Sequence, residues 1–367
     1  MPFHTGWLPR EGFTGDVLGG WIKQSILNPA LTIPLLLGVL LTPLGQTFTK
    51  SHESAVGQLK YLATFGVVRV LNGYLNRRAV NNGVSDRFDW ADGELVVCTG
   101  GADGIGKQIV LLLAELGVKV AVLDIRPPTY EAPKDVRSYQ CDIRSTSSIA
   151  QAAAQIRLDF GRDPTVLINN AGLFQGKTVL DSSEADLRAV FDVNTLAHYW
   201  LAKEFLPSMV AQNHGMIVTV ASLAGYVPTA NMIDYSSSKA AAITFHEGLA
   251  AELVTRYKAP RVRTVLVTQG YTKTPLFAGW QPKAEFLSTS LEPETVAEET
   301  VRFILSGNSG QLILPGFFKF SALGMRILPD WIAVRARNFS ASHITEKFRG
   351  RTGVVESKQA KQEKREE

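Results

Sequence analysis

The sequence is poor in the residues that build disulfide frameworks and metal sites. Only two cysteines occur in 367 residues, Cys98 and Cys141, and both fall in predicted core strands. A buried thiol usually behaves as a small hydrophobe, so we expect no disulfide framework and a reducing, cytosol-facing environment. The six histidines lack the spacing of metal ligands, and we expect no metal site.

Charge is also sparse and nearly balanced. The formal net charge is +4, with 20% charged and 45% hydrophobic residues, which is the composition of a globular protein. So small an excess does not indicate nucleic acid as a partner, and it favours an anionic membrane surface only weakly.

One stretch near the N-terminus has no charge at all. Residues 24–49 contain no Asp, Glu, Lys or Arg, and residues 31–44 are nearly all apolar. A helix that spans a membrane needs about 20 such residues. Prolines at three positions argue against one straight helix: Pro29, Pro34 and Pro43. We expect a membrane anchor that either spans the bilayer or lies in it. More basic residues follow the stretch than precede it, which predicts a cytosolic catalytic domain.

The next segment and the end of the chain have different patterns. Residues 55–75 place apolar side chains at helical spacing, which predicts either an interfacial helix or a helix packed on the domain. The last ten residues, from Lys358, are mostly charged and predict a disordered tail.

A glycine-rich turn stands between a predicted strand, residues 94–99, and a predicted helix, residues 107–116. Its glycines permit backbone angles closed to other residues and let a diphosphate approach the chain. The N-terminus of the following helix favours negative charge. We expect the turn to bind a dinucleotide through Gly100, Asp103, Gly104, Ile105 and Gly106. Alone, such a turn is weak evidence.

A second apolar strand, residues 118–124, strengthens this interpretation because it ends in Asp124, twenty residues beyond Gly104. This carboxylate can accept hydrogen bonds from both adenosine ribose hydroxyls and would repel a 2′-phosphate. Asp103 adds negative charge, whereas Arg126 could pair with such a phosphate. We therefore predict NAD rather than NADP. The alternative is that Asp124 only caps a loop.

Further strands are predicted at residues 136–142, 165–172 and 216–222. The first places Asp142 and Ile143 beside an adenine, and the second runs into a tight turn that contains Asn170, Ala171 and Gly172. Strands that alternate with helical stretches predict an α/β fold with a doubly wound parallel sheet.

Two residues of an apolar helix have the right spacing for proton transfer. Tyr235 and Lys239 are four apart and share one helix face. A free tyrosine has a pKa of about 10, but a nearby ammonium and an oxidised nicotinamide would favour the phenolate and lower that pKa. Ser222 ends a strand and could hydrogen-bond the substrate oxygen opposite Tyr235.

Together these segments resemble the short-chain dehydrogenase/reductase family over about residues 92–315. The resemblance implies that Ser222, Tyr235 and Lys239 are catalytic and that Asn194 holds a water in a proton relay. Residues 269–274 resemble the family's Pro-Gly-x-x-x-Thr segment, with Gln269 in place of proline. The resemblance implies that nicotinamide contacts come from Gly270, Thr272 and Thr274.

The sequence around Asn194, Ser222 and Tyr235 resembles the membrane-bound retinol and hydroxysteroid dehydrogenases. This resemblance implies a lipophilic substrate of the retinoid, steroid or fatty alcohol class, a location at the endoplasmic reticulum membrane or a lipid droplet, and a homodimer. Two apolar groups predict either a greasy channel or a dimer or domain contact. They contain Tyr271, Leu276, Phe277, Trp280, Phe286 and Leu287, and then Phe317, Phe318, Phe320 and Trp331.

We expect an anchor region over residues 1–90, a dehydrogenase domain over 91–316 and an apolar C-terminal extension with its charged tail over 317–367. The predicted activity is hydride transfer between NAD(H) and a lipophilic alcohol or ketone. Two alternatives stay open: an NADPH-dependent carbonyl reductase, and a non-catalytic lipid-surface protein on the same fold.

Overall fold

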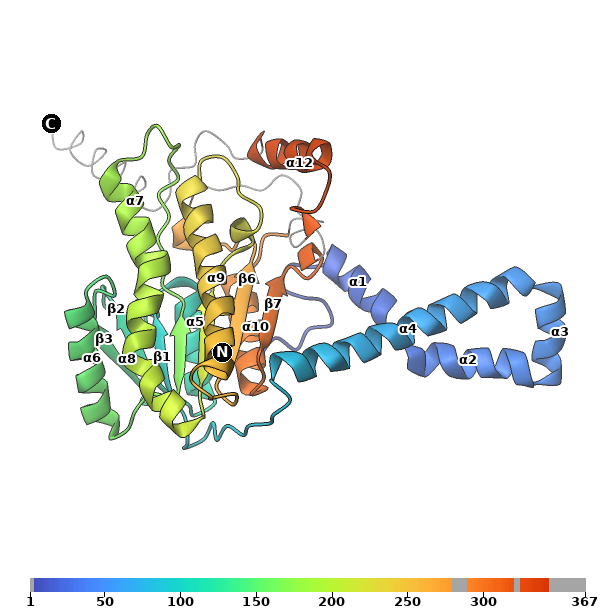
Figure 1. Ribbon diagram of the computed structural model, residues 1–367, viewed down its shortest axis with the longest axis horizontal. Coiled ribbons are helices and arrows are strands. Elements are labelled where there is room, and N and C mark those ends of the chain that lie inside the picture. Colours follow the sequence, from blue (N-terminus) through green and yellow to red (C-terminus); the bar gives the residue numbers. More distant parts are fainter. Residues whose placement is uncertain (1–2, 279–288, 320–323, 343–367) are drawn as a thin grey trace.

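Seven parallel strands form one sheet in the computed structural model, which describes residues 3–278, 289–319 and 324–342 (Figure 1). Their order across the sheet is β3-β2-β1-β4-β5-β6-β7. The strands are β1 (Leu95–Thr99), β2 (Lys119–Asp124), β3 (Val136–Gln140), β4 (Val166–Asn169), β5 (Met216–Val220), β6 (Arg263–Gln269) and β7 (Gly310–Leu314). The chain order reverses between β1 and β4, and a ligand crevice is expected at that point. The predicted doubly wound α/β fold is confirmed.

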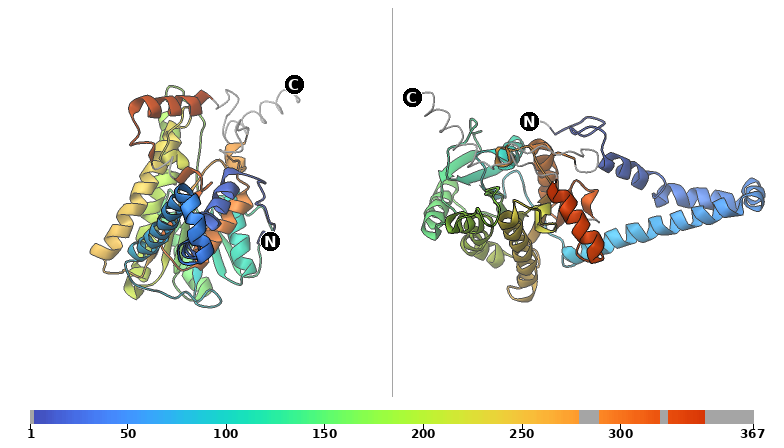
Figure 2. Two further views of the ribbon diagram at one scale, coloured as in Figure 1. Left: turned by 90° about the vertical axis from the view of Figure 1, so that its right-hand side faces the viewer. Right: turned by 90° about the horizontal axis from the view of Figure 1, so that it is seen from above.

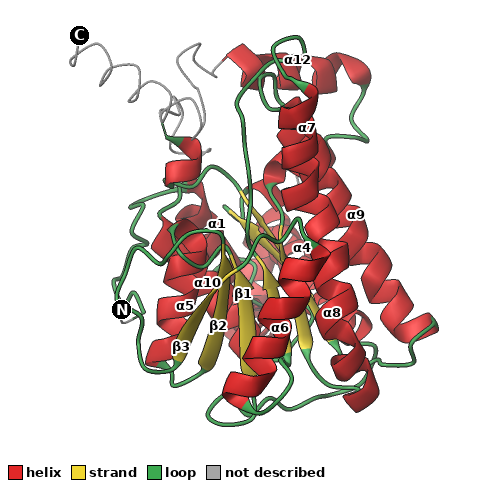
Figure 3. Cartoon of the chain, turned by 90° about the vertical axis from the view of Figure 1, so that its left-hand side faces the viewer, coloured by secondary structure: helices red, strands yellow, loops and turns green. Residues whose placement is uncertain are grey.

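Helices cover both faces of the sheet, as Figure 3 shows. Side chains from α6 (Thr146–Phe160), α8 (Ala197–Gln212) and α9 (Ile233–Thr255) pack on one face. Side chains from α5 (Gly104–Glu115) and α10 (Pro293–Leu305) pack on the other. Because both faces are covered, the central strands β1, β4 and β5 are buried along their whole length rather than alternating between buried and exposed residues.

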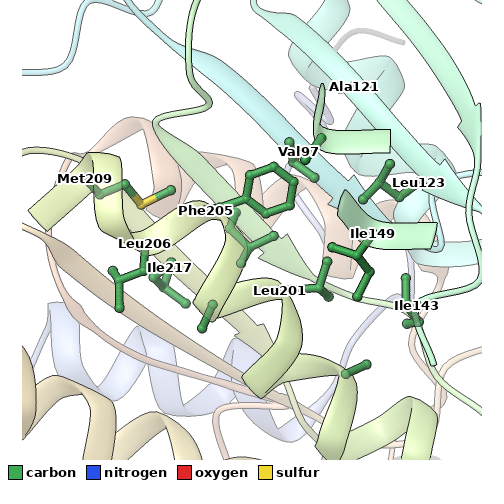
Figure 4. Close-up of a cluster of buried hydrophobic side chains, with 14 of the residues drawn as sticks. Val97, Ala121, Leu123, Ile143, Ile149, Leu201, Phe205, Leu206, Met209 and Ile217 are labelled. Carbon is green, nitrogen blue, oxygen red and sulfur yellow. The ribbon is translucent and has the colours of Figure 1, made fainter. Parts of the chain in front are cut away.

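Successive residues of a strand pack into the hydrophobic clusters on opposite faces of the sheet, because side chains alternate between the two faces. In β1, Val97 joins the cluster under α8, whereas Val96 and Cys98 join the cluster under α5. Figure 4 shows the first cluster, in which α8 side chains such as Leu201 and Phe205 meet the sheet. This packing fixes the strand ends, and with them the side chains that follow each strand.

Four helices precede the sheet: α1 (Gly15–Gln24), α2 (Pro29–Leu41), α3 (Pro43–Ser51) and α4 (Glu53–Val80). Figures 1 and 2 show α2 and α4 side by side in an arm that projects from the sheet-containing domain. The predicted helix over residues 55–75 is confirmed and is longer than expected. Pro34 lies inside α2, whereas Pro43 begins a new helix. The apolar stretch is therefore divided near Thr42.

The arm exposes much apolar surface. The most exposed large apolar side chains on it are Leu31, Leu35, Leu41, Leu44, Tyr61, Phe65, Val68 and Leu71. Among the described residues, no single helix is both long enough and apolar enough to cross a membrane. Helices α1 and α2 meet these requirements only as a pair, and the pair is bent by 43°.

The segment between α4 and β1 is fastened to the edge of the sheet opposite the strands' carboxyl ends. The Arg263 guanidinium donates to the Asn81 and Val84 carbonyl oxygens at 3.1 and 2.9 Å. The His214 ring contacts the carboxylates of Asp86 at 2.8 Å and Glu94 at 3.3 Å. These contacts join the arm to the sheet.

The remaining helices lie near the carboxyl ends of the strands. Helix α7 spans Glu184–Phe191, and α12 (Asp330–Ser342) belongs to the chain after β7 (Figure 1). Phe317 is about half exposed, and Trp331 of α12 is mostly exposed. Phe320 and the predicted tail from Lys358 lie outside the described residues.

Candidate active site

A cavity of about 690 Å³ lies at the carboxyl ends of the central strands. Most of the predicted cofactor residues line it: Gly100, Asp103, Gly104, Ile105, Asp124, Asp142, Ile143, Asn170, Ala171, Gly172, Tyr235, Lys239, Gly270, Thr272 and Thr274. Gly106, Asn194 and Ser222 do not line the cavity. The fold thus gathers segments that are far apart in the sequence at one edge of the sheet.

In the glycine-rich turn, the backbone packs directly against other backbone atoms. A Cβ atom on Gly100 would lie 2.8 Å from Cα of Ala171, and the residue has a φ of +67°. A Cβ atom on Gly106 would lie 2.3 Å from the Gly100 carbonyl oxygen. Gly106 is therefore needed for packing inside the turn rather than for lining the cavity. Helix α5 begins at Gly104, earlier than predicted, and Asp103 caps it by accepting from the Gly104 N–H at 2.8 Å.

Asp124 closes this turn from the neighbouring strand. Its Oδ2 accepts from the Ala102 N–H and its Oδ1 from the Arg126 N–H, each at 3.1 Å. The side chain therefore does cap a loop, yet it also lines the cavity. A carboxylate oxygen can accept more than one hydrogen bond, so both oxygens keep capacity for a ligand.

Asp142 and Arg144 form the next part of the wall. The guanidinium of Arg144 donates to both carboxylate oxygens of Asp142, with contacts of 2.7–3.1 Å. These hydrogen bonds lower the pKa of Asp142 from its ordinary value. Arg126 and Arg144 both line the same end of the cavity as Asp124.

Thr99 links the glycine turn to the turn after β4, a role that the sequence interpretation missed. Its hydroxyl accepts from the Asn170 and Ala171 N–H groups at 3.0 and 3.1 Å. The Asn170 amide donates in return to the Thr99 and Gly100 carbonyl oxygens. A threonine at a strand end is common, and only the pairing of β1 with β4 reveals its function.

Tyr235 and Lys239 line the cavity, and Ser222 lies near Tyr235 without lining it. Tyr235 lies in the first turn of α9, whereas Ser222 follows β5. The Ser222 hydroxyl donates to the Gln269 carbonyl oxygen at 3.3 Å and accepts from the Ala224 N–H at 3.1 Å. Lys239 lies one turn later, with Nζ 5.7 Å from the centre of the Tyr235 ring. The ammonium donates to the Val220 carbonyl oxygen at 2.8 Å. The three predicted side chains are therefore brought together.

Burial dominates the titration of these groups. It raises the pKa of Tyr235 to about 12, although the nearby Ser222 hydroxyl favours the phenolate and opposes the shift. Burial also lowers the pKa of Lys239 to about 8. The expected lowering of the tyrosine pKa is therefore not produced by this chain's own groups, because desolvation outweighs them.

Asn194 occupies a short π-helical turn, Asp192–Leu196, between α7 and α8. Its Oδ1 accepts from the Leu173 N–H at 2.8 Å, and its Nδ2 donates to the Leu173 carbonyl and to Ser238 Oγ. Ser238, whose hydroxyl donates to the Tyr235 carbonyl oxygen at 2.8 Å, was also missed by the sequence interpretation. A Cβ on Gly172 would lie 3.7 Å from Asn194 Oδ1 and 3.8 Å from Lys239 Nζ.

Two aromatic rings pack against Tyr235. Phe174 and Phe277 lie 5.3 and 5.8 Å from it between ring centres, and 5.3 Å from each other. Met232 and Leu276 complete this apolar group. Tyr271 contacts Phe277 at 6.0 Å. Trp280, Phe286 and Leu287 of the predicted apolar loop lie outside the described residues.

The sequence of this chain matches a known family of enzymes. The short chain dehydrogenase family matches residues 94–285. Dehydrogenase RED2 of Cochliobolus heterostrophus is 44% identical over 54% of this chain and 75% of its own. Mouse epidermal retinol dehydrogenase 2 is 32% identical over 70% of this chain and 86% of its own, and human estradiol 17-beta-dehydrogenase 11 is 33% identical over 68% and 84%.

A solved short-chain dehydrogenase from Streptomyces avermitilis has the same fold, with a TM-score of 0.54 and 23% identity over 66% of this chain and 97% of its own. The family match and the relatives agree with the residues gathered at the cavity. This chain therefore belongs to the short-chain dehydrogenase family, in the branch of the retinol and 17-beta-hydroxysteroid dehydrogenases, and is an NAD(P)-dependent oxidoreductase that acts on CH–OH groups.

Proposed function

We propose that the enzyme transfers a hydride between NAD(H) and a lipophilic alcohol or ketone, with Tyr235 as the acid and base. One observation carries the proposal. Tyr235 and Lys239 line the same cavity as the glycine turn, and Ser222 lies near Tyr235. A dinucleotide on that turn would extend toward Tyr235, which is the arrangement that hydride and proton transfer need.

The residues present fit a dinucleotide. The close backbone approach at Gly100 and Gly106 makes a surface without side chains, directly before the N-terminus of α5. The Asp124 oxygens would accept from ribose hydroxyls, while Thr272 and Thr274 would lie against the nicotinamide end. Bound NAD supplies the hydride acceptor and a positively charged ring.

In oxidation, Tyr235 takes the proton of the substrate hydroxyl while Ser222 orients the oxygen. Lowering the Tyr235 pKa from about 12 to about 7 requires roughly 7 kcal/mol of differential stabilisation. The positively charged nicotinamide would have to supply most of it, since the pKa is about 12 with the Lys239 ammonium already in place. Lys239 would hold the nicotinamide ribose.

Asn194 would hold the water of the proton relay with its side-chain oxygen, because its amide nitrogen already makes two hydrogen bonds. Its amide nitrogen is fully used by Leu173 and Ser238, and its Oδ1 keeps one acceptor site beside Gly172 and the Lys239 ammonium. A relay water held there would lie between Lys239 and the outside of the site.

Asp124 supports NAD over NADP, since a buried carboxylate that already orders the turn would repel a 2′-phosphate. The runner-up is an NADPH-dependent carbonyl reductase. Arg126 and Arg144 favour it because both line the cavity near Asp124 and could pair with that phosphate.

The apolar side chains of Leu173, Leu276 and Phe277 in the cavity lining support a substrate of the retinoid, steroid or fatty alcohol class. The names of the retinol and estradiol dehydrogenases point to the same class. A non-catalytic lipid-surface protein would tolerate loss of Ser222, Tyr235 or Lys239, and all three are present, with Tyr235 and Lys239 both lining the cavity.

We also propose the membrane as a partner. The exposed apolar arm supports an anchor at the endoplasmic reticulum membrane or a lipid droplet, with the catalytic domain toward the cytosol. The division into residues 1–90, 91–316 and 317–367, and the homodimer, stay predictions. NADH formation from a series of alcohols by the full chain in detergent or vesicles tests the activity. A wild-type enzyme that reduces no NAD with any long-chain alcohol would contradict the proposal.

A further inference from the structure

The first residues of the chain contact the catalytic domain before the arm begins. We call residues 3–16 the N-terminal strap. Its first part is fastened to α10, where the Arg10 guanidinium donates to Glu298 Oε1 at 2.6 Å and the His4 N–H donates to the same oxygen at 3.1 Å. The Arg302 guanidinium lies 4.7 Å from the centre of the Phe3 ring.

Glu11 of the strap holds one side of the loop that follows β6. Its Oε1 accepts from the Glu292 N–H at 2.9 Å, at the start of α10. The preceding residue, Leu291, pairs with the loop: its N–H donates to the Tyr271 carbonyl at 3.0 Å, and its carbonyl accepts from the Lys273 N–H at 2.9 Å. Leu291 and Thr272 form an isolated β-bridge, and Thr272 lines the cavity. Glu11 therefore holds the residue that directly follows this bridge.

Asp16 of the strap contacts the chain on the other side of the loop that follows β6. Its two carboxylate oxygens accept from the Gly316 and Phe317 N–H groups at 2.7 and 2.6 Å. The two residues before Gly316 contact Gly270, which lines the cavity. The Gly270 N–H donates to the Leu314 carbonyl at 2.7 Å, and a Cβ on Gly270 would lie 3.4 Å from Pro315. Asp16 also lies in the first turn of α1, which leads into the arm.

We propose that Glu11 and Asp16 are positioning residues for the cavity wall formed by residues 270–277, and that they couple this wall to the root of the arm. Each is a carboxylate that accepts from backbone N–H groups, which is the stronger kind of hydrogen bond. They act from opposite sides of the segment that carries Gly270, Thr272 and Phe277. The proposal rests on the proposed function, since that segment is expected to meet nicotinamide and substrate.

The test compares Glu11→Ala and Asp16→Ala with Glu53→Ala in the full chain. Glu53 is an exposed carboxylate at the start of α4 and is the matched control for charge loss on the N-terminal region. Two readouts are needed: KM and kcat for a long-chain alcohol, and hydrogen exchange of the peptide that contains residues 270–277.

We expect each strap variant to raise KM about tenfold with kcat within about twofold, since a lost charged hydrogen bond loosens the wall without removing a reacting group. Exchange should rise at residues 270–277 and not in β1 or β4. Glu11→Gln keeps a neutral acceptor and should give an intermediate KM, and Glu53→Ala should match the wild type.

Unchanged KM and unchanged exchange in both strap variants would overturn the proposal. So would a lower melting temperature with exchange raised evenly over the domain, because that result describes a purely structural contact. If the wild type oxidises no alcohol, the proposed function fails, and the exchange of residues 270–277 still decides whether the strap positions them.

Discussion

Asp124 has two functions that one substitution can separate. Asp124→Asn keeps the shape of the side chain and one acceptor oxygen, but it removes the negative charge. The bond to either the Ala102 or the Arg126 N–H can survive, and so the turn should largely hold. Asp124→Ser also removes the carboxylate, and we expect it to raise NADP affinity because the Arg126 guanidinium could then pair with the 2′-phosphate without an opposing charge.

Removing the negative charge should affect cofactor choice more than removing one hydrogen bond. For a phosphate at about 6 Å and an effective dielectric constant of about 20, one unit of repulsion is about 3 kcal/mol. This corresponds to roughly a hundredfold in affinity. Asp124 is only 9% exposed, so salt screens it less than it screens a surface charge. We therefore expect Asp124→Asn to shift the ratio of NADPH to NADH affinity about a hundredfold toward NADPH.

Fluorescence titration of both reduced cofactors measures this ratio. Asp181→Asn is the control for loss of one carboxylate charge, because Asp181 is exposed and does not line the cavity. It should leave the ratio within about threefold. If wild type binds both cofactors equally, or if Asp124→Asn leaves the ratio unchanged, the assignment of Asp124 to the ribose is wrong.

Other predictions concern substrate, membrane and stability. Affinity should rise with alcohol length by about 0.8 kcal/mol per buried methylene, and Phe277→Ala should raise KM more for long than for short alcohols. A specificity constant that peaks at short polar alcohols would refute this. Carbonate extraction should leave the full chain in the membrane pellet, and its release would argue against an anchor. His214 should stabilise the fold in a pH-dependent way, because its hydrogen bonds with Glu94 and Asp86 raise its pKa to about 9. This contribution is complete below about pH 6.5 and is lost as pH rises through 9. The melting temperature should therefore fall over that window in wild type and not in His214→Gln.

The sheet and the glycine turn could be predicted because their signals are local. Short apolar runs bounded by turns predicted β1 to β5 close to their observed bounds, and the glycines predicted the turn, whereas no bounds were predicted for β6 and β7. The early start of α5 was missed because Asp103, inside the turn, caps the helix at Gly104. Within the arm, proline alone did not mark the break, since Pro34 is accommodated inside α2.

The contacts that complete the site depend on tertiary structure and leave no local pattern. Thr99 acts only because β1 pairs with β4, and Ser238 only because α9 packs on the turn that carries Asn194. The strap is similar: Asp16 meets Phe317 across 301 positions of sequence. Burial of Tyr235 is also a tertiary property, and it explains why the tyrosine pKa rises where the sequence suggested that it would fall.

The central claim is that Tyr235 moves the proton of a lipophilic alcohol. The direct measurement is NADH formation by the full chain with a retinol-sized alcohol, for wild type and for Tyr235→Phe, together with NADH binding by fluorescence. We predict that Tyr235→Phe loses turnover and binds NADH nearly as well as wild type, since only the proton carrier is removed. A Tyr235→Phe enzyme that keeps more than about a tenth of the wild-type rate would contradict this claim, because general acid–base catalysis contributes about a hundredfold or more.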